Sequence, residues 1–497
     1  MKFFSLYSFL LISFLTPSCL NAQAPPIQWQ NTIGGSDGDW LHAIHQLSDG
    51  GYILGGYSAS NSSGDKTEDN QGGQDMWVVK LDANGEVLWQ NTIGGSEIDQ
   101  LSTLNTTTDG GYILGGYTES NTSGDKTEDN HGLSDYWILK LDADGHIQWQ
   151  NTIGGTSYDV LSEVQQTNDG GFIIGGRSDS SISGDKIENS QGSYDYWVVK
   201  LDASGNIHWQ NTIGGADYDF FTSLQQTSDN GYILGGFTKS DISGDKTEDS
   251  HGKEDYWVVK LDDLGIIQWQ KTIGGSEYDR LNALLQTSDG GYILGGESLS
   301  DISGDKTENG VGGYDYWVVK LNDMGSIQWQ NTIGGTDFDY LTTLQQTTDG
   351  GYLLGGYSLS NISGDKTENS RGYGDYWIVK LSPLGDIQWQ KTIGGEFEDR
   401  AYSLQQTNDG AYILGGFSYS NISGEKTEDC QGGHDFWVVK IGVTTPTINK
   451  NQAPVTFLPL PNPFSDHFTL QLNVPAVIDL NAQIHNQLGR IVSELYF

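Results

Sequence analysis

Closely spaced carboxylates are the most regular set of chemically active side chains in this sequence. The first set is Asp65, Glu68, Asp69 and Asp75, within the pattern S-G-D-K-T-E-[DN] followed by G-x-x-D. Carboxylates that lie close together recruit hard cations such as Ca²⁺ or raise one another's pKa values. The first carboxylate recurs along the chain as Asp65, Asp125, Asp185, Asp245, Asp305, Asp365 and Glu425.

Two interpretations of these carboxylates are open. In the first, Ca²⁺ is the one cofactor expected, and its candidate ligands are Asp65, Glu68, Asp69, Asp75, Asp125, Asp245, Asp305 and Asp365. Their spacing does not match the EF-hand or a similar calcium loop. In the second, the aspartates cap turns by accepting hydrogen bonds from backbone N–H groups, with Lys66 and its equivalents as counter-ions. The second interpretation needs no cofactor.

A catalytic constellation is not evident. The nine histidines are scattered, and no H-x-x-x-H or C-x-x-C pair occurs. His42 and His45 are three residues apart, so on a β-strand they would face opposite ways. We therefore expect that the chain is not an enzyme. The many paired carboxylates leave a glycosidase or a lyase as an open alternative.

Ligand binding is expected where repeated units differ, because one ligand does not need seven equal copies of a site. The residue after a recurrent aspartate varies most, as Trp40, Gln100, Val160, Phe220, Arg280, Tyr340 and Arg400. Aromatic and arginine side chains are favoured at binding surfaces. The candidate binding residues are Trp40, Phe220, Arg280, Tyr340 and Arg400. The alternative is that an unconstrained loop has simply drifted.

A repeat of 60 residues positions all of these side chains. The string [IV]-x-W-Q begins at residues 27, 87, 147, 207, 267, 327 and 387, with no insertion between copies. Within one unit we predict strands at Ile267–Ile273, Leu281–Thr287, Tyr292–Leu294 and Tyr316–Leu321. Asp-Gly turns and alternating apolar residues favour hairpins between them. Trp317 lies in a strand that is apolar on both sides, so we expect that strand to be covered on both faces.

Seven units of four strands predict an all-β protein, a seven-bladed β-propeller over residues 27–442. The chain begins with an unpaired W-Q strand and ends one strand short. We therefore expect Ile27–Ile33 to pair beside Trp437 and close the ring, which removes both free edges. A linear solenoid is the alternative. With the W-Q strand outermost, the acidic loops and the Gly-Gly crossovers share one face.

Composition limits the partners. The 497 residues carry a net charge of −40, which argues against nucleic acid and anionic membranes as partners. The only cysteines are Cys19 and Cys430, so we expect no internal disulfide in the mature chain.

The first 24 residues have the features of a secretory signal peptide, with Lys2, the apolar run Phe3–Leu15, and cleavage after Ala22 or Ala24. The sequence thus predicts a protein that is secreted or held at the outer cell surface. No later segment is apolar enough to predict a membrane span.

The repeat resembles the bacterial β-propeller repeat called SBBP. The motifs that carry the resemblance are Trp269–Gly275, Asp289–Tyr292 and Asp315–Gly325. This resemblance implies a propeller in surface or exported proteins, and it implies no common activity.

After an expected linker at residues 443–453, residues 454–497 resemble the C-terminal sorting domain of the type IX secretion system. The matching segments are Leu460–Phe464, Phe468–Leu470 and Asn486–Arg490. The resemblance implies a small β-sandwich that the export machinery at the outer membrane recognises. The sequence stops at Phe497, before the strand pair that usually follows, so the domain looks truncated and the β-sandwich partial.

Together these features favour an exported binding or adhesion scaffold that engages a glycan or a protein. The alternatives are a carbohydrate-active enzyme built on a propeller and a structural surface-coat protein.

Overall fold

A computed structural model describes residues 23–442, 481–485 and 491–496 of the chain. All regular elements in these ranges are β-strands. None of the described residues forms a helix long and apolar enough to cross a membrane.

Each blade contains four strands, named here by their position from the axis outward. The innermost strands are β2 (Asp39–Gln46), β6 (Asp99–Thr106), β10 (Asp159–Gln166), β14 (Asp219–Gln226), β18 (Asp279–Gln286), β22 (Asp339–Gln346) and β26 (Asp399–Gln406). The second strands are β3 (Tyr52–Ser58), β7 (Tyr112–Thr118), β11 (Phe172–Ser178), β15 (Tyr232–Thr238), β19 (Tyr292–Ser298), β23 (Tyr352–Ser358) and β27 (Tyr412–Ser418). The third strands are β4 (Asp75–Leu81), β8 (Asp135–Leu141), β12 (Asp195–Leu201), β16 (Asp255–Leu261), β20 (Asp315–Leu321), β24 (Asp375–Leu381) and β28 (Asp435–Ile441). The outermost strands are β1 (Ile27–Ile33), β5 (Val87–Ile93), β9 (Ile147–Ile153), β13 (Ile207–Ile213), β17 (Ile267–Ile273), β21 (Ile327–Ile333) and β25 (Ile387–Ile393).

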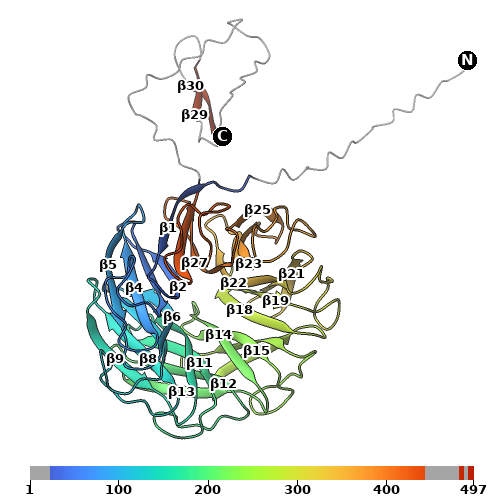
Figure 1. The fold of residues 1–497 in the computed structure, drawn as a ribbon. Coiled ribbons are helices and arrows are strands. Elements are labelled where there is room, and N and C mark those ends of the chain that lie inside the picture. The colour runs from blue at the N-terminus through green and yellow to red at the C-terminus, as the bar shows by residue number, and fades with distance from the viewer. Residues whose placement is uncertain (1–22, 443–480, 486–490, 497) are drawn as a thin grey trace, which may run out of the picture. The chain divides into compact units, whose positions relative to one another are not determined.

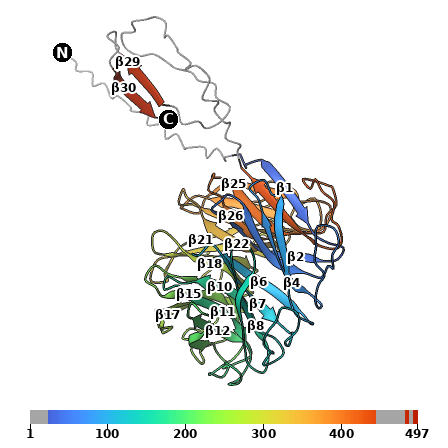
Figure 2. The same cartoon turned by 90° about the vertical axis from the view of Figure 1, so that its left-hand side faces the viewer.

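The strands form seven antiparallel sheets, and the sheets stand around a central axis (Figure 1; Figure 2). Six sheets follow chain order, such as β2-β3-β4-β5. This arrangement confirms the seven-bladed β-propeller and rules out the linear solenoid. It also confirms that the W-Q strand is the outermost strand of each blade.

The seventh sheet has the order β1-β28-β27-β26, so the first strand of the chain completes the last blade. In the β1–β28 ladder, Ile33 pairs with Phe436 and Thr32 pairs with Trp437. The predicted ring closure is thereby confirmed. Closure removes the two free sheet edges that an open array would present.

Each blade is held to the next through its third strand. The tryptophans of these strands, such as Trp317, are fully buried, and β20 is buried along its whole length. The hydroxyl of Tyr256 on β16 donates to the backbone oxygen of Trp317 in the next blade at 3.0 Å. Equivalent bonds come from Tyr136, Tyr196, Tyr316 and Tyr376. Met76 and Phe436 occupy the two remaining positions and have no hydroxyl to donate.

The second strand is longer than the sequence predicted, because it continues through two glycines. In β19, Gly295 and Gly296 pair with Ala283 and Leu281 of β18, and the register shifts between these two partners. A Cβ on Gly296 would lie 1.9 Å from the backbone oxygen of Arg280. The glycines therefore permit a close approach of the two strands beside a β-bulge at Asn282.

The C-terminal region forms a separate unit, and β29 (Asn481–His485) pairs antiparallel with β30 (Ile491–Tyr496). The rest of the predicted sorting domain, including Leu460–Phe464 and Asn486–Arg490, lies outside the described residues, as do residues 1–22 of the predicted signal peptide. One hairpin-like pair of strands does not support the predicted partial β-sandwich.

Candidate functional site

The long loops and the Gly-Gly crossovers come together on one face of the propeller, as expected. A crossover leads from each outermost strand to the innermost strand of the next blade, and a long loop leads from the second strand to the third. In antiparallel blades these connections leave from the same end. The backbone N–H of Asp65 in the first long loop donates to the oxygen of Gly34 in the crossover at 2.8 Å.

Four candidate metal ligands of the first loop accept hydrogen bonds from separate backbone N–H groups. Asp65 accepts from Gly34 at 3.4 Å, and Glu68 accepts from Thr92 at 2.7 Å. Asp69 accepts from Ser62 at 2.9 Å, and the fully buried Asp75 accepts from Gln71 at 2.5 Å. These contacts are the ones that the turn-capping interpretation predicts.

The repeated first aspartate of the loop links neighbouring blades. Its partners are Gly94 and Gln71 for Asp125, Gly214 and Gln191 for Asp245, Gly274 and His251 for Asp305, and Gly334 for Asp365. In each case the glycine belongs to the preceding crossover. Calcium binding by these eight carboxylates stays a prediction.

The lysine of the loop is buried. Lys66 is 2 % exposed, and its ammonium group donates to the backbone oxygen of Glu68 and the hydroxyl of Thr92, both at 2.7 Å. It also lies 6.0 Å from the ring centroid of Trp77. Burial lowers the pKa of Lys66. The side chain therefore fastens the loop to the outer strands of its own blade.

A possible cation site that the sequence analysis did not identify lies on a turn of the opposite face. Asp142, Asp144 and His146 each offer a ligand atom within 4.8 Å of the others, and no other such group occurs within the described ranges. The carboxylate of Asp142 accepts from the backbone N–H groups of Asp144 and His146, both at 2.9 Å. This pattern is that of an Asx turn, which needs no ion.

The five candidate binding residues lie at the second position of the innermost strands, at the end of the central channel where the long loops gather. All five side chains are half-buried: Trp40, Phe220, Arg280, Tyr340 and Arg400. Each of them contacts an aromatic ring from a second strand or from the end of a long loop. Trp40, for example, stacks on Tyr57 with a centroid distance of 5.0 Å.

These contacts join into one continuous band, which we call the rim network. It runs through Phe220, Phe237, Arg280, Tyr314, Tyr340, Tyr357, Arg400, Phe417, His434, Trp40 and Tyr57. The longest step in it is the 5.9 Å from the guanidinium carbon of Arg400 to the centroid of Phe417. The structure thus brings the five candidates together through six residues that sequence reasoning missed.

The missed residues had a visible signal. They occupy two further positions that vary between units, the sixth residue of the second strand and the residue before the third strand. The first reads Tyr57, Tyr117, Arg177, Phe237, Glu297, Tyr357 and Phe417, and the second reads Gln74, Ser134, Tyr194, Glu254, Tyr314, Gly374 and His434. These two positions and the second position of the innermost strand lie next to one another in the structure. Their variation therefore gives one surface whose side chains differ from blade to blade.

Both arginines of the rim network carry their own counter-ions. Arg280 forms an ion pair with the buried carboxylate of Glu254, and Arg400 forms one with Glu398. Partial burial acts to lower the pKa of Arg280, but the hydrogen bond that Arg280 donates to the carboxylate of Glu254 raises this pKa above its ordinary value. These ion pairs leave the flat faces of the two guanidinium groups free to stack on neighbouring rings.

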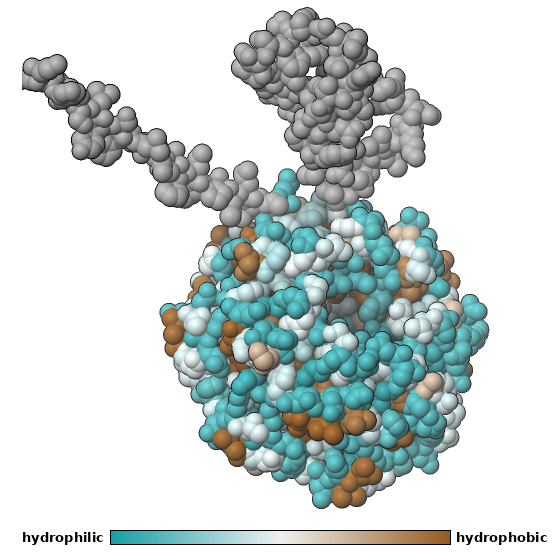
Figure 3. Space-filling view, turned by 180° about the vertical axis from the view of Figure 1, so that it is seen from behind, coloured by the Kyte–Doolittle hydropathy of each residue, from teal (hydrophilic) through white to brown (hydrophobic). Residues whose placement is uncertain are grey.

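Below the rim, side chains of all seven innermost strands line a central cavity of about 430 Å³. The view in Figure 3 shows a mostly hydrophilic surface that is hollowed near its middle. His42 and His45 are both among the residues that line this cavity, as are Ala43 and Ile44 between them. A β-bulge between Leu41 and Ala43 interrupts the regular alternation of this strand. That His42 and His45 face opposite ways stays a prediction.

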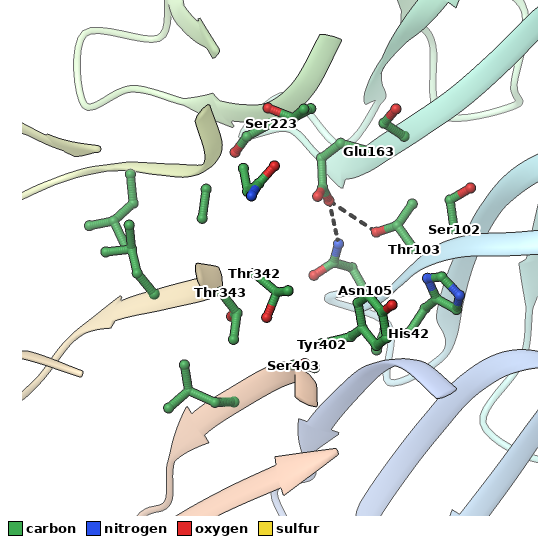
Figure 4. Close-up of a pocket in the computed structure, with 18 of the residues that line it drawn as sticks. His42, Ser102, Thr103, Asn105, Glu163, Ser223, Thr342, Thr343, Tyr402 and Ser403 are labelled. Atoms are coloured by element: carbon green, nitrogen blue, oxygen red, sulfur yellow. Dashed lines mark hydrogen bonds between the residues drawn. The ribbon is translucent and has the colours of Figure 1, made fainter. Parts of the chain in front are cut away.

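Glu163 is the one acidic side chain among the residues that line this cavity (Figure 4). One of its carboxylate oxygens accepts hydrogen bonds from Thr103 at 3.0 Å and Asn105 at 3.3 Å. Burial raises the pKa of Glu163 to about 7, although these two bonds oppose the shift. A carboxyl group of this kind can release or take up a proton near neutral pH.

No family model matches this chain. The regulatory protein FlaEY of Caulobacter vibrioides is 23 % identical over an alignment of 292 residues, which covers 54 % of this chain and 30 % of that protein's length. Sqt1 from Chaetomium thermophilum has a TM-score of 0.42 and 11 % identity, over 84 % of this chain and 99 % of that one. The WD40 domain of Pan2 from Neurospora crassa has a TM-score of 0.43 and 11 % identity, over 82 % and 97 %. These similarities do not assign the chain to a family.

Proposed function

We propose that this β-propeller is a binding or adhesion scaffold that engages a glycan or a protein ligand at the rim network. The observation that supports the proposal is the continuous contact between Trp40, Phe220, Arg280, Tyr340 and Arg400 through intervening aromatic rings. Aromatic and arginine side chains are enriched among the few residues that contribute most of the binding free energy at protein interfaces.

The test is binding of the full chain to a glycan array and to candidate surface proteins. Trp40→Ala and Tyr340→Ala should each weaken the interaction by roughly tenfold or more, as expected for removal of a large aromatic contact. Val160→Ala is the matched control, since Val160 occupies the same strand position outside the rim network. Unchanged binding in both aromatic variants would place the ligand elsewhere.

We also propose that the protein is secreted or held at the outer cell surface, and that residues 454–497 direct its export by the type IX machinery. The support is the character of residues 1–24 and the sorting-domain motifs beginning at Leu460. A chain that lacks residues 454–497 should remain in the periplasm of a host with this system. Equal amounts of both chains outside the cell would contradict the export route.

A carbohydrate-active enzyme is the second candidate, and Glu163 is the residue that favours it. Its raised pKa suits a proton donor, and the cavity around it is lined mainly by hydroxyl and amide groups. Turnover of a glycan that Glu163→Gln abolishes while binding persists would support this candidate. Binding without turnover would support the scaffold.

A further inference from the structure

Arg177 differs from the other arginines near the channel mouth because it has no anionic partner. Among the described residues, no carboxylate oxygen lies within 4.0 Å of its guanidinium group, and its side chain donates no hydrogen bond to them. Arg280 and Arg400, in contrast, each pair with a glutamate. A guanidinium group has five N–H donors, so those of Arg177 are available to an external acceptor.

The surroundings of Arg177 are aromatic and partly dry. Its guanidinium carbon lies 4.1 Å from the ring centroid of Phe220 and 5.7 Å from that of Tyr194. Tyr218 contacts both rings, at 5.5 Å from Tyr194 and 5.6 Å from Phe220. The arginine side chain is half-buried, and this burial lowers its pKa. A charge that is partly removed from water without a partner is costly unless an anion completes the site.

Position 177 is also one where this blade differs from all the others. The equivalent residues are Tyr57, Tyr117, Phe237, Glu297, Tyr357 and Phe417, so Arg177 is the one cation in the series. Phe220 connects it to the rim network through Phe237, with a centroid distance of 4.8 Å. The unpaired charge therefore stands at one end of the proposed binding surface.

We propose that Arg177 binds the carboxylate of an acidic sugar, with the neighbouring aromatic rings packing against the apolar faces of the glycan. This inference rests on the proposed function of the rim network and names its ligand class. A guanidinium fork matches a carboxylate through two parallel N–H···O bonds. The net charge of −40 disfavours a polyanion, so we expect a glycan with isolated carboxylates.

The test compares two oligosaccharides that differ only in the carboxylate: one that contains a uronic acid, and the same one with the acid reduced to the alcohol. Calorimetry with the full chain should show tighter binding of the acidic form. Arg177→Tyr should reduce that affinity by roughly tenfold to a hundredfold, the effect of losing a charge-assisted hydrogen-bond pair. It should leave the reduced form unaffected. Tyrosine already stands at this position in three blades, as Tyr57, Tyr117 and Tyr357, so the variant should fold.

Arg371→Gln is the control for net charge, because Arg371 is already paired with Glu425 in a loop. It should leave the affinity for the acidic form unchanged. Equal affinity of the wild type for the acidic and reduced oligosaccharides would overturn the inference and leave the scaffold function standing. An unchanged affinity in Arg177→Tyr would overturn it in the same way. Failure of the wild type to bind any glycan, or binding of a carboxylate-ended peptide instead, would overturn the sugar ligand.

Discussion

The indole N–H of Trp437 donates a 3.1 Å hydrogen bond to the side-chain oxygen of Gln30, a residue 407 positions earlier in the chain. In the first blade the same contact joins Trp77 and Gln90, only 13 residues apart, at 3.2 Å. The seventh blade thus reproduces with distant residues what the other blades make locally. The propeller is therefore closed by an ordinary outermost strand that happens to be the first in sequence.

A strand at the C-terminal end of the propeller should be able to replace β1 as the closing strand. A chain that begins at Gly34 lacks β1, so β28 becomes an edge strand without its outer partner. We expect this chain to lose more than about 4 kcal/mol of unfolding free energy. Insertion of a copy of residues 82–93 directly after Ile441 should restore stability, since this segment supplies the turn and the strand found in blade one. Chemical denaturation measures both chains. If the insertion fails to restore stability, β1 has a role beyond pairing.

The tyrosine hydroxyls between blades should contribute measurably. Tyr256→Phe removes the buried hydrogen bond that the tyrosine hydroxyl donates to the backbone oxygen of Trp317. We expect a loss of about 1–2 kcal/mol in unfolding free energy. The reverse change, Phe436→Tyr, should be neutral or stabilising, because Phe436 contacts Trp77 as the tyrosines contact their tryptophans. Equal stability of Tyr256→Phe and the wild type would contradict the account.

Stability should rise as the pH falls from 8 to about 5. Burial is the main cause that raises the pKa of Asp39 and Asp75 to about 6 and that of Asp315 and Asp435 to about 7. An unfolded aspartate has a pKa of about 4, so between these values the folded state binds more protons and acid stabilises it. We expect the melting temperature to be roughly 5 °C higher at pH 5 than at pH 8.

The gain should end below about pH 4. Partial burial acts to raise the pKa of Asp109, but hydrogen bonds from Thr107 and Lys140 lower it to about 2. The stability that comes from this lowered pKa is lost as the pH falls from about 4 through 2. Thermal melts between about pH 2 and pH 8 measure both the gain in stability and its loss. Asp315→Asn should flatten the slope between pH 5 and 8, and a melting temperature independent of pH there would contradict the assignment.

Gly38 should control the position of Trp40. A Cβ on Gly38 would lie 2.4 Å from the Trp40 ring, and the equivalent residues elsewhere include Tyr218 and Tyr278. Gly38→Tyr should therefore fold normally, displace the indole and weaken ligand binding by roughly tenfold. Ile98→Tyr makes the same substitution beside Gln100, outside the rim network, and should leave binding unchanged. Tryptophan fluorescence provides a direct readout of the displacement.

If the loop carboxylates bind calcium, the melting temperature should be higher with Ca²⁺ than with a chelator. Since Glu68 already accepts a 2.7 Å hydrogen bond from Thr92, an ion there would have to share its carboxylate. Glu68→Gln should then reduce the calcium-dependent shift. An identical melting temperature with Ca²⁺ and with chelator would remove the calcium interpretation and leave turn capping.

Most of the fold could be predicted because the determinants are local and repeated seven times. Trp317 and its neighbours form the apolar run expected of a strand that is covered on both faces, and the Asp-Gly turns mark the hairpins. The extension of β19 through Gly295 and Gly296 was missed because glycine reads as a turn residue, whereas here it admits a neighbouring strand. The bulge between Leu41 and Ala43 leaves no local sequence signal.

The candidate site could be predicted only in part. Departure from the repeat identified Trp40, Phe220, Arg280, Tyr340 and Arg400, since an asymmetric function needs asymmetric residues. Position 177 varies just as strongly, but the predicted second strand ends three residues before it, so nothing in the sequence placed Arg177 beside Phe220. Only the fold shows that residues 40, 57 and 74 lie close together, as do the equivalent residues of the other blades. The burial of Lys66 could not be predicted for a similar reason, because it depends on strands contributed by the rest of the blade.

The closing strand has one more consequence. Because β1 pairs with β28 as each outermost strand pairs within its own blade, the acceptor groove on one molecule is indistinguishable from that on another. Two copies refolding side by side can thus exchange their leading segments and produce intertwined dimers. Dilution during renaturation should favour monomers, and the dimer fraction should grow with protein concentration.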